Sequence, residues 1–141
     1  MQCWLNNTFR QAAWAPLTVF VFYAVAAKVF YAYLAYPWLD MPTHFAGGMA
    51  ITYFYLAAIA HAQDLLGTIP RLIQRLLALG LTALTAVVWE FLEYLSDRLF
   101  GTLMNLGVVD TLMDLFLGLA GGLMMVVIAA WRAPRYRPRP L

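Results

Sequence analysis

Six of the seven acidic residues of this chain and one of its two histidines fall in three short stretches of an otherwise apolar sequence. These residues are Asp40, His44, Glu90, Glu93, Asp97, Asp110 and Asp114. On a helix, residues three or four positions apart share one face, so the polar groups of each stretch lie together. Carboxylates and an imidazole that converge can bind a divalent cation or pass protons between them. We therefore expect the chemistry of the protein at this cluster.

The composition indicates an integral membrane protein. Of its 141 residues, 64% are hydrophobic and 11% are charged, whereas in soluble domains these shares are about half and about a quarter. Several apolar runs approach the roughly 20 residues that a helix needs to cross a bilayer. The net charge of +2 is small and the basic residues are scattered, so nucleic acid is not an expected partner. The single cysteine, Cys3, excludes an internal disulfide.

Hydropathy predicts an all-α, polytopic membrane protein with a bundle of four transmembrane helices. The predicted spans cover residues 14–36, 42–62, 72–95 and 109–131. They form one domain over residues 1–132. Gly67 and Pro70 break the chain after the second span, where a short segment is expected to lie at the membrane interface. Residues 133–141 are rich in Arg and Pro and are expected to form an extended cytoplasmic tail.

The positions of Lys and Arg predict the orientation. With four spans, seven arginines fall on one side of the membrane: Arg10, Arg71, Arg75, Arg132, Arg135, Arg137 and Arg139. Arg98 falls on the other side, and Lys28 lies within the first span. Because positively charged segments stay in the cytoplasm, we expect both termini there. The acidic cluster then lies in the outer half of the bundle.

The carboxylates need a positive partner, because they would repel one another strongly in a low-dielectric interior. We expect a divalent metal ion, with Zn, Mn, Fe and Mg not distinguished, and its ligands are expected to be His44, Glu90, Glu93, Asp110 and Asp114. Asp40 is expected to orient His44. Lys28 and Asp97 are expected to support the site or compensate its charge, with Lys28 paired to Glu90.

Simpler roles remain open for several of these residues. Asp40 and Asp110 also suit helix N-caps or first-turn acids, which the helix dipole favours. Asp97 also suits a solvated loop. The pairing of Lys28 with Glu90 could serve only to specify helix packing.

Glycines follow two of the polar stretches and predict close helix packing. They are Gly47, Gly48, Gly118 and Gly122. Small residues let the backbones of neighbouring membrane helices approach each other. We expect the second and fourth spans to meet at these positions, just below the acids.

Three motifs resemble those of a known family. DMPTHFAGG resembles the D-x-x-x-H-F-x-x-G element of the small bacterial inner-membrane proteins of the YjdF type, WEFLEY resembles their E-x-x-E-aromatic element, and DTLMDLFLGLAGG resembles their D-T-x-x-D-x(n)-G element. The order is the same, over residues 38–125, but the connector before the last element is shorter here and lacks the usual Gly-Asp. The resemblance implies a bacterial inner-membrane protein and no particular reaction. The site residues that it implies are Asp40, His44, Glu90, Glu93, Asp110 and Asp114, with Gly48 and Gly122 as helpers.

Three functions are compatible with the cluster, and only the first is enzymatic. A metal-dependent hydrolase or transferase could act on a lipid-linked or periplasmic substrate, because a bound ion activates water or polarises a phosphoryl or carbonyl group. A non-catalytic accessory subunit would use membrane lipid and another membrane protein, or a second copy of the chain, as partners. Proton or ion transport would use the carboxylates as a relay.

Overall fold

The computed structural model of the chain describes residues 2–132, and this part is helical without any strand. The helices are α1 (Gln2–Ala12), α2 (Trp14–Lys28), α3 (Ala32–Ala35), α4 (Asp40–Leu66), α5 (Arg71–Phe100) and α6 (Val108–Arg132), with a 3-10 turn η1 (Pro37–Leu39) before α4. The predicted all-α class is therefore confirmed. The expected tail, residues 133–141, lies outside the described residues.

Three segments of the described part are long and apolar enough to cross a membrane. They are Pro37–Leu66, Arg71–Phe100 and Val108–Arg132. The spans expected over residues 42–62, 72–95 and 109–131 lie within them. Helix α2 is also apolar, but its 15 residues fall short of the roughly 20 that a crossing helix needs. The structure thus has three candidate spans and one shorter apolar helix, where four full spans were expected.

The first expected span, residues 14–36, is not a single helix. Helix α2 ends at Lys28, and Tyr31 has a positive φ of 51°. A residue in this left-handed conformation ends a helix because it turns the chain away from the helix axis. The short α3 then folds back over the start of α4, where the Tyr33 hydroxyl lies 2.6 Å from Thr43 Oγ1. The hydropathy of this stretch is that of a continuous span, so hydropathy could not reveal the break.

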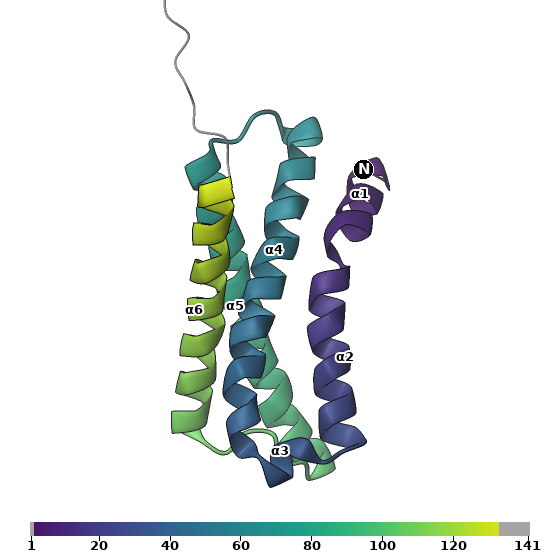
Figure 1. The fold of residues 1–141 in the computed structure, drawn as a ribbon, viewed down its shortest axis with the longest axis vertical. Coiled ribbons are helices and arrows are strands. Elements are labelled where there is room, and N and C mark those ends of the chain that lie inside the picture. The colour runs from purple at the N-terminus through teal and green to yellow at the C-terminus, as the bar shows by residue number, and fades with distance from the viewer. Residues whose placement is uncertain (1, 133–141) are drawn as a thin grey trace, which may run out of the picture.

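Helix α1 was not expected from hydropathy, and it lengthens α2 on its N-terminal side. Ala13, between the two helices, keeps a right-handed helical conformation, so the two helices follow each other along α4 (Figure 1). The Trp4 indole donates to the carbonyl of Ala58 at 2.7 Å. Thr8 is 2% exposed. Side-chain contacts with α4 therefore hold α1, although its sequence is too polar to read as part of a span.

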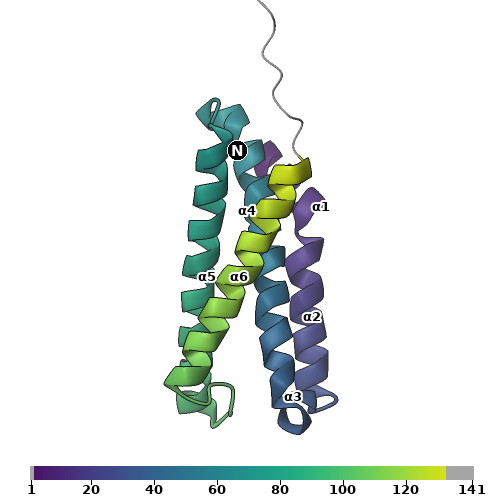
Figure 2. The same cartoon turned by 60° about the vertical axis from the view of Figure 1, so that its left-hand side comes forward.

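Helices α4 and α6 cross in close contact, and glycines allow it (Figure 2). A Cβ atom on Gly48 would collide with the backbone of Gly118, and one on Gly121 would collide with the carbonyl of Phe45. A Cβ atom on Gly122 would press on the Thr52 hydroxyl. The packing role expected for Gly47 is wrong, because nothing lies within 4 Å of the position of its Cβ.

The start of α4, the end of α5 and the start of α6 meet at one end of the bundle, together with α3 (Figure 1). We call this the α3 end. The N-terminus and the last turn of α6 lie at the opposite end, and so does the break between α4 and α5. That break falls at Gly67, which has a φ of 79°, and at Pro70. The helix-breaking role expected for these two residues is confirmed.

Candidate functional site

The polar cluster is assembled at the α3 end by three different helices. His44 lies in the second turn of α4, Glu90 and Glu93 near the end of α5, and Asp114 in the second turn of α6. The three carboxyl residues are buried: Glu90 is 7% exposed and Glu93 and Asp114 are each 3% exposed. Charged residues are rarely buried to this degree without a partner. Their position within apolar helices therefore calls for a chemical reason.

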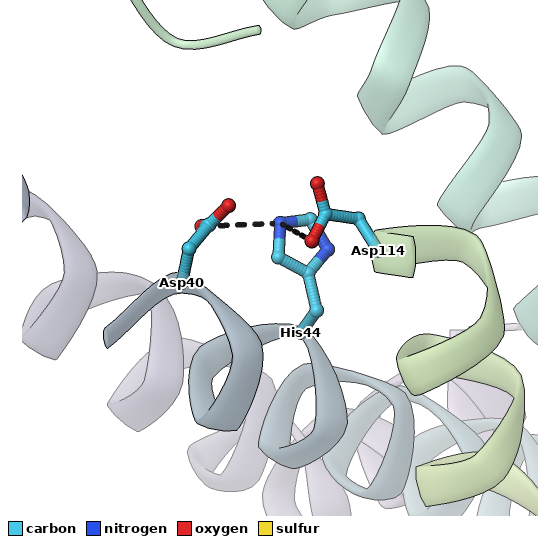
Figure 3. Close-up of side chains that lie close together, drawn as sticks. All are labelled: Asp40, His44 and Asp114. Carbon is cyan, nitrogen blue, oxygen red and sulfur yellow. Dashed lines mark ion pairs between the residues drawn. The ribbon is translucent and has the colours of Figure 1, made fainter. Parts of the chain in front are cut away.

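His44 lies between carboxylates from two helices (Figure 3). Its Nε2 atom is 3.4 Å from Asp40 Oδ1 on the same helix and 3.9 Å from Asp114 Oδ1 on α6. Asp40 precedes His44 by one helical turn, which places both on one face of α4. The imidazole therefore points into the cluster and presents one nitrogen to two carboxylates.

Two overlapping groups of side chains bring potential metal ligands close enough together that they could hold an ion. Asp40, His44 and Asp114 form one group, and His44, Glu90 and Glu93 form the other. Within each group one ligand atom from every residue lies within 4.8 Å of the others. His44 belongs to both groups and so connects them. Carboxylate oxygen and imidazole nitrogen are usual ligands of Zn²⁺ and Mn²⁺.

Several oxygen atoms of the cluster are buried without a hydrogen-bond partner. They are Glu90 Oε2, Glu93 Oε2 and Asp114 Oδ2. The other oxygen of Glu93 accepts a hydrogen bond of 2.7 Å from the Trp89 indole. A buried polar atom without a partner costs about 1–3 kcal/mol, and more when it is charged. Each of the three buried carboxyl groups therefore keeps one oxygen without a hydrogen-bond partner among the described residues.

The family model described as "Predicted membrane protein (DUF2238)" matches residues 1–135. The chain belongs to this membrane-protein family. The match covers all the described helices, and the expectation of a membrane protein is confirmed. It does not test the resemblance to the YjdF-type proteins, which stays a prediction. No curated protein and no solved structure matches the chain.

Asp110 and Asp97, two of the expected site residues, have hydrogen-bond partners outside the polar cluster. Asp110 accepts a hydrogen bond of 2.8 Å from the Leu106 amide and belongs to neither group. Asp97 accepts hydrogen bonds from Thr102 Oγ1 and from the amides of Met104 and Asn105. The contact of Asp110 agrees with its simpler role as an acid in the first turn of α6, whereas Asp97 lies in the last turn of α5 and not in a solvated loop. Asp97 organises the connector between α5 and α6.

The pairing of Lys28 with Glu90 is wrong. Lys28, the last residue of α2, is exposed, whereas Glu90 is buried, and no ion pair joins these two described residues. Helix α2 packs along α4, and its backbone does not pack closely against α5. The expectation assumed that the first span was a regular member of a four-helix bundle beside the third. Lys28 thus cannot neutralise the cluster.

Two contributions to the cluster were missed or underestimated from the sequence. Trp89 supports Glu93 through its indole hydrogen bond, and the spacing of four residues on one helix could have indicated this contact. Asp40 was expected only to orient His44, yet its oxygen has the spacing of a ligand in the first group. The start of α4 therefore contributes a carboxylate as well as the imidazole.

Proposed function

We propose that this membrane protein binds a divalent metal ion at the α3 end of its bundle, with His44 as the central ligand. Glu90, Glu93 and Asp114 would supply carboxylate oxygens, and Asp40 would supply one or orient His44. The observation that carries this proposal is that three buried carboxyl groups, each with one oxygen that has no hydrogen-bond partner, lie in the groups formed with the imidazole of His44.

Charge supports a cation over a fully proton-neutralised cluster. Four carboxyl groups from α4, α5 and α6 share one histidine, and the basic side chain expected to assist, Lys28, lies elsewhere. Protons would neutralise single carboxylates, but a dication offers one common partner to oxygens from three helices. Helix bundles often hold metals in this way, between carboxylates and histidines on facing helices.

A bound ion would support hydrolysis or group transfer. It would activate a water molecule or polarise a phosphoryl or carbonyl group, and a carboxylate that does not bind the ion would accept the proton. We propose a lipid-linked substrate, because the cluster lies inside helices that are apolar enough to cross a membrane. An accessory subunit and proton transport are the competing functions, and neither requires a metal.

The test is elemental analysis of protein purified in detergent, incubated with Zn²⁺ or Mn²⁺ and then desalted. We expect stoichiometric metal in the wild type and loss of it in His44→Ala and Glu93→Gln. The matched control is His61→Ala, because His61 lies on the same helix but near its other end, with Nε2 2.7 Å from Gln11 Oε1. For the carboxylates the control is Asp64→Asn, at an exposed position of α4.

Two results would overturn the proposal. One is wild-type protein that retains no metal after loading, and the other is His44→Ala protein that retains as much as the wild type. Absence of metal together with stable co-purification of another membrane protein would favour the accessory subunit. Metal-free protein that carries protons across a vesicle membrane would favour transport.

We also propose that both termini face the cytoplasm of a bacterial inner membrane, with the cluster on the outer side. The support is that α1, the start of α5 and the end of α6 lie toward the end opposite the α3 end (Figure 1), and that Arg10, Arg71 and Arg132 belong to these segments. Cys3, the exposed and only cysteine of the chain, reports the topology directly. A membrane-impermeant maleimide should leave it unlabelled in intact cells, and should label Cys3→Ser/Leu103→Cys, in which the new thiol lies in the exposed connector after α5.

A further inference from the structure

A cavity of about 420 Å³ opens beside the polar cluster and extends away from it along α4. Its volume lies within the range of about 300–1,000 Å³ that is usual for pockets that bind small molecules. Asp40, Thr43 and His44 line one end, and Phe9 and Tyr55 line the other. The cavity thus joins the polar cluster to the apolar middle of the protein.

The cavity is long, and most of its wall is apolar. From His44 to Tyr55 the chain of α4 rises by about 16 Å at 1.5 Å per residue. Between these ends the wall is formed by Leu17, Phe20 and Ile51, among other apolar residues. The polar pair at the far end is internally satisfied, because the Tyr55 hydroxyl lies 2.8 Å from Thr85 Oγ1. The wall therefore offers few unpaired polar groups except at the cluster.

The packing of α2 explains why this space is open. Helix α2 contacts α4 closely but meets α5 mainly through rings: Phe20 and Tyr23 lie with their centroids 6.4 and 5.7 Å from that of Trp89. Gly47 faces the cavity, with no atom within 4 Å of its Cβ position. The missing side chain at this position leaves room next to His44.

We propose that the cavity holds one hydrocarbon chain of a bilayer phospholipid, with its phosphate headgroup at Asp40 and His44. The cavity is lined by α4 and α5, two of the segments that are able to cross a membrane, and by the shorter apolar helix α2. Lipid chains are the molecules that surround such segments in a bilayer. Its polar end would carry the metal ion of the proposed function, and a dication between carboxylates is complementary to an anionic phosphate. The headgroup part rests on that proposed function, whereas the chain part rests on the cavity alone.

The test is native mass spectrometry of detergent-purified protein titrated with phosphatidylglycerol. The decisive variant is Gly47→Leu, because Gly47 lines the cavity, its Cβ position is open, and the rest of the leucine side chain would occupy the space that the lipid chain needs. The matched control is Gly80→Leu, because Gly80 is a helical glycine of α5 with equally open space and does not line the cavity. We expect Gly47→Leu to weaken lipid binding by about tenfold or more, since several buried methylene groups lose their contacts. Gly80→Leu should bind as the wild type does.

Metal content measured on the same samples separates this inference from the proposed function. Gly47→Leu should keep its metal, and if it loses the metal, Ile51→Trp fills the cavity one turn further from His44. Equal lipid binding by Gly47→Leu, Ile51→Trp and Gly80→Leu would overturn the chain site, whether or not metal is bound. Binding that depends on Gly47 but is the same after chelation, and equally strong for diacylglycerol, would overturn the headgroup assignment.

Discussion

His44 of α4 and Asp114 of α6 face each other with Nε2 and Oδ1 3.9 Å apart. Each residue lies one helical turn before the glycine at which its helix touches the other, Gly48 on α4 and Gly118 on α6. The two helices run in the same direction from the α3 end (Figure 1). The glycine contact therefore sets the separation of the two polar side chains.

Alanine at Gly48 should separate these helices, whereas alanine at Gly47 should not. A Cβ atom on Gly48 meets the backbone of Gly118, and backbone cannot move aside as a flexible side chain can. We expect Gly48→Ala to cost about 1–3 kcal/mol of unfolding free energy and to weaken metal binding. Gly47→Ala has open space and should stay within about 1 kcal/mol of the wild type. Unfolding in mixed micelles compares the two variants, and equal stabilities would contradict the role of the contact.

Replacement of Trp89 by phenylalanine should weaken metal binding while the fold is kept. The change removes the indole donor to Glu93 Oε1 but leaves an aromatic ring opposite Phe20 and Tyr23. Partners that orient a metal ligand typically change affinity by about 10–100-fold. Titration with a fluorescent competitor for Zn²⁺ measures the change. Trp131→Phe, at an exposed position at the opposite end of α6, is the control, and equal affinities of both variants would exclude this role of Trp89.

The buried hydroxyl pair of α4 and α5 should respond unequally to the loss of either partner. Thr82 Oγ1 donates to the carbonyl of Ala78 at 2.9 Å, so Thr52 must donate the hydrogen bond of 2.7 Å between the two threonines. Thr82→Val removes the acceptor and leaves the Thr52 hydroxyl unsatisfied, whereas Thr52→Val leaves the bond to Ala78 intact. We expect Thr82→Val to cost roughly 0.6–1.7 kcal/mol and Thr52→Val to cost less. SDS-induced unfolding measures the two losses of unfolding free energy. A larger loss in Thr52→Val than in Thr82→Val would show that Thr82, and not Thr52, donates the hydrogen bond between them.

Removal of the Asp97 carboxylate should loosen the connector between α5 and α6 and leave the metal in place. Its oxygens accept from the amides of Met104 and Asn105, both at 2.9 Å. Hydrogen bonds to a charged group contribute about 1.5–3 kcal/mol, so these amides should exchange about tenfold faster or more in Asp97→Ala. Asp97→Asn keeps one acceptor oxygen, so its amide exchange rates should lie between those of the wild type and of Asp97→Ala. Loss of metal in Asp97→Ala, with the protein still folded, would instead show that Asp97 contributes to the metal site.

The clustering of the acids could be predicted from the sequence because it follows from helix periodicity. Spacings of three and four residues place Glu90 with Glu93, and Asp40 with His44, whatever the helices pack against. The membrane class and the helix break at Gly67 and Pro70 are equally local, since they depend on hydropathy and on backbone conformation. These features needed no knowledge of the tertiary structure.

Only the tertiary structure decided which groups meet and where space remains. The sequence does not show that α2 ends at Lys28, because the residues after Lys28 remain apolar. Nor does it show that α2 packs along α4 and not closely against α5. It does not separate Gly47, which faces a cavity, from Gly48, which touches α6. One position along a helix turns a residue by about 100°, so only the packed neighbours decide which of two adjacent glycines is a contact.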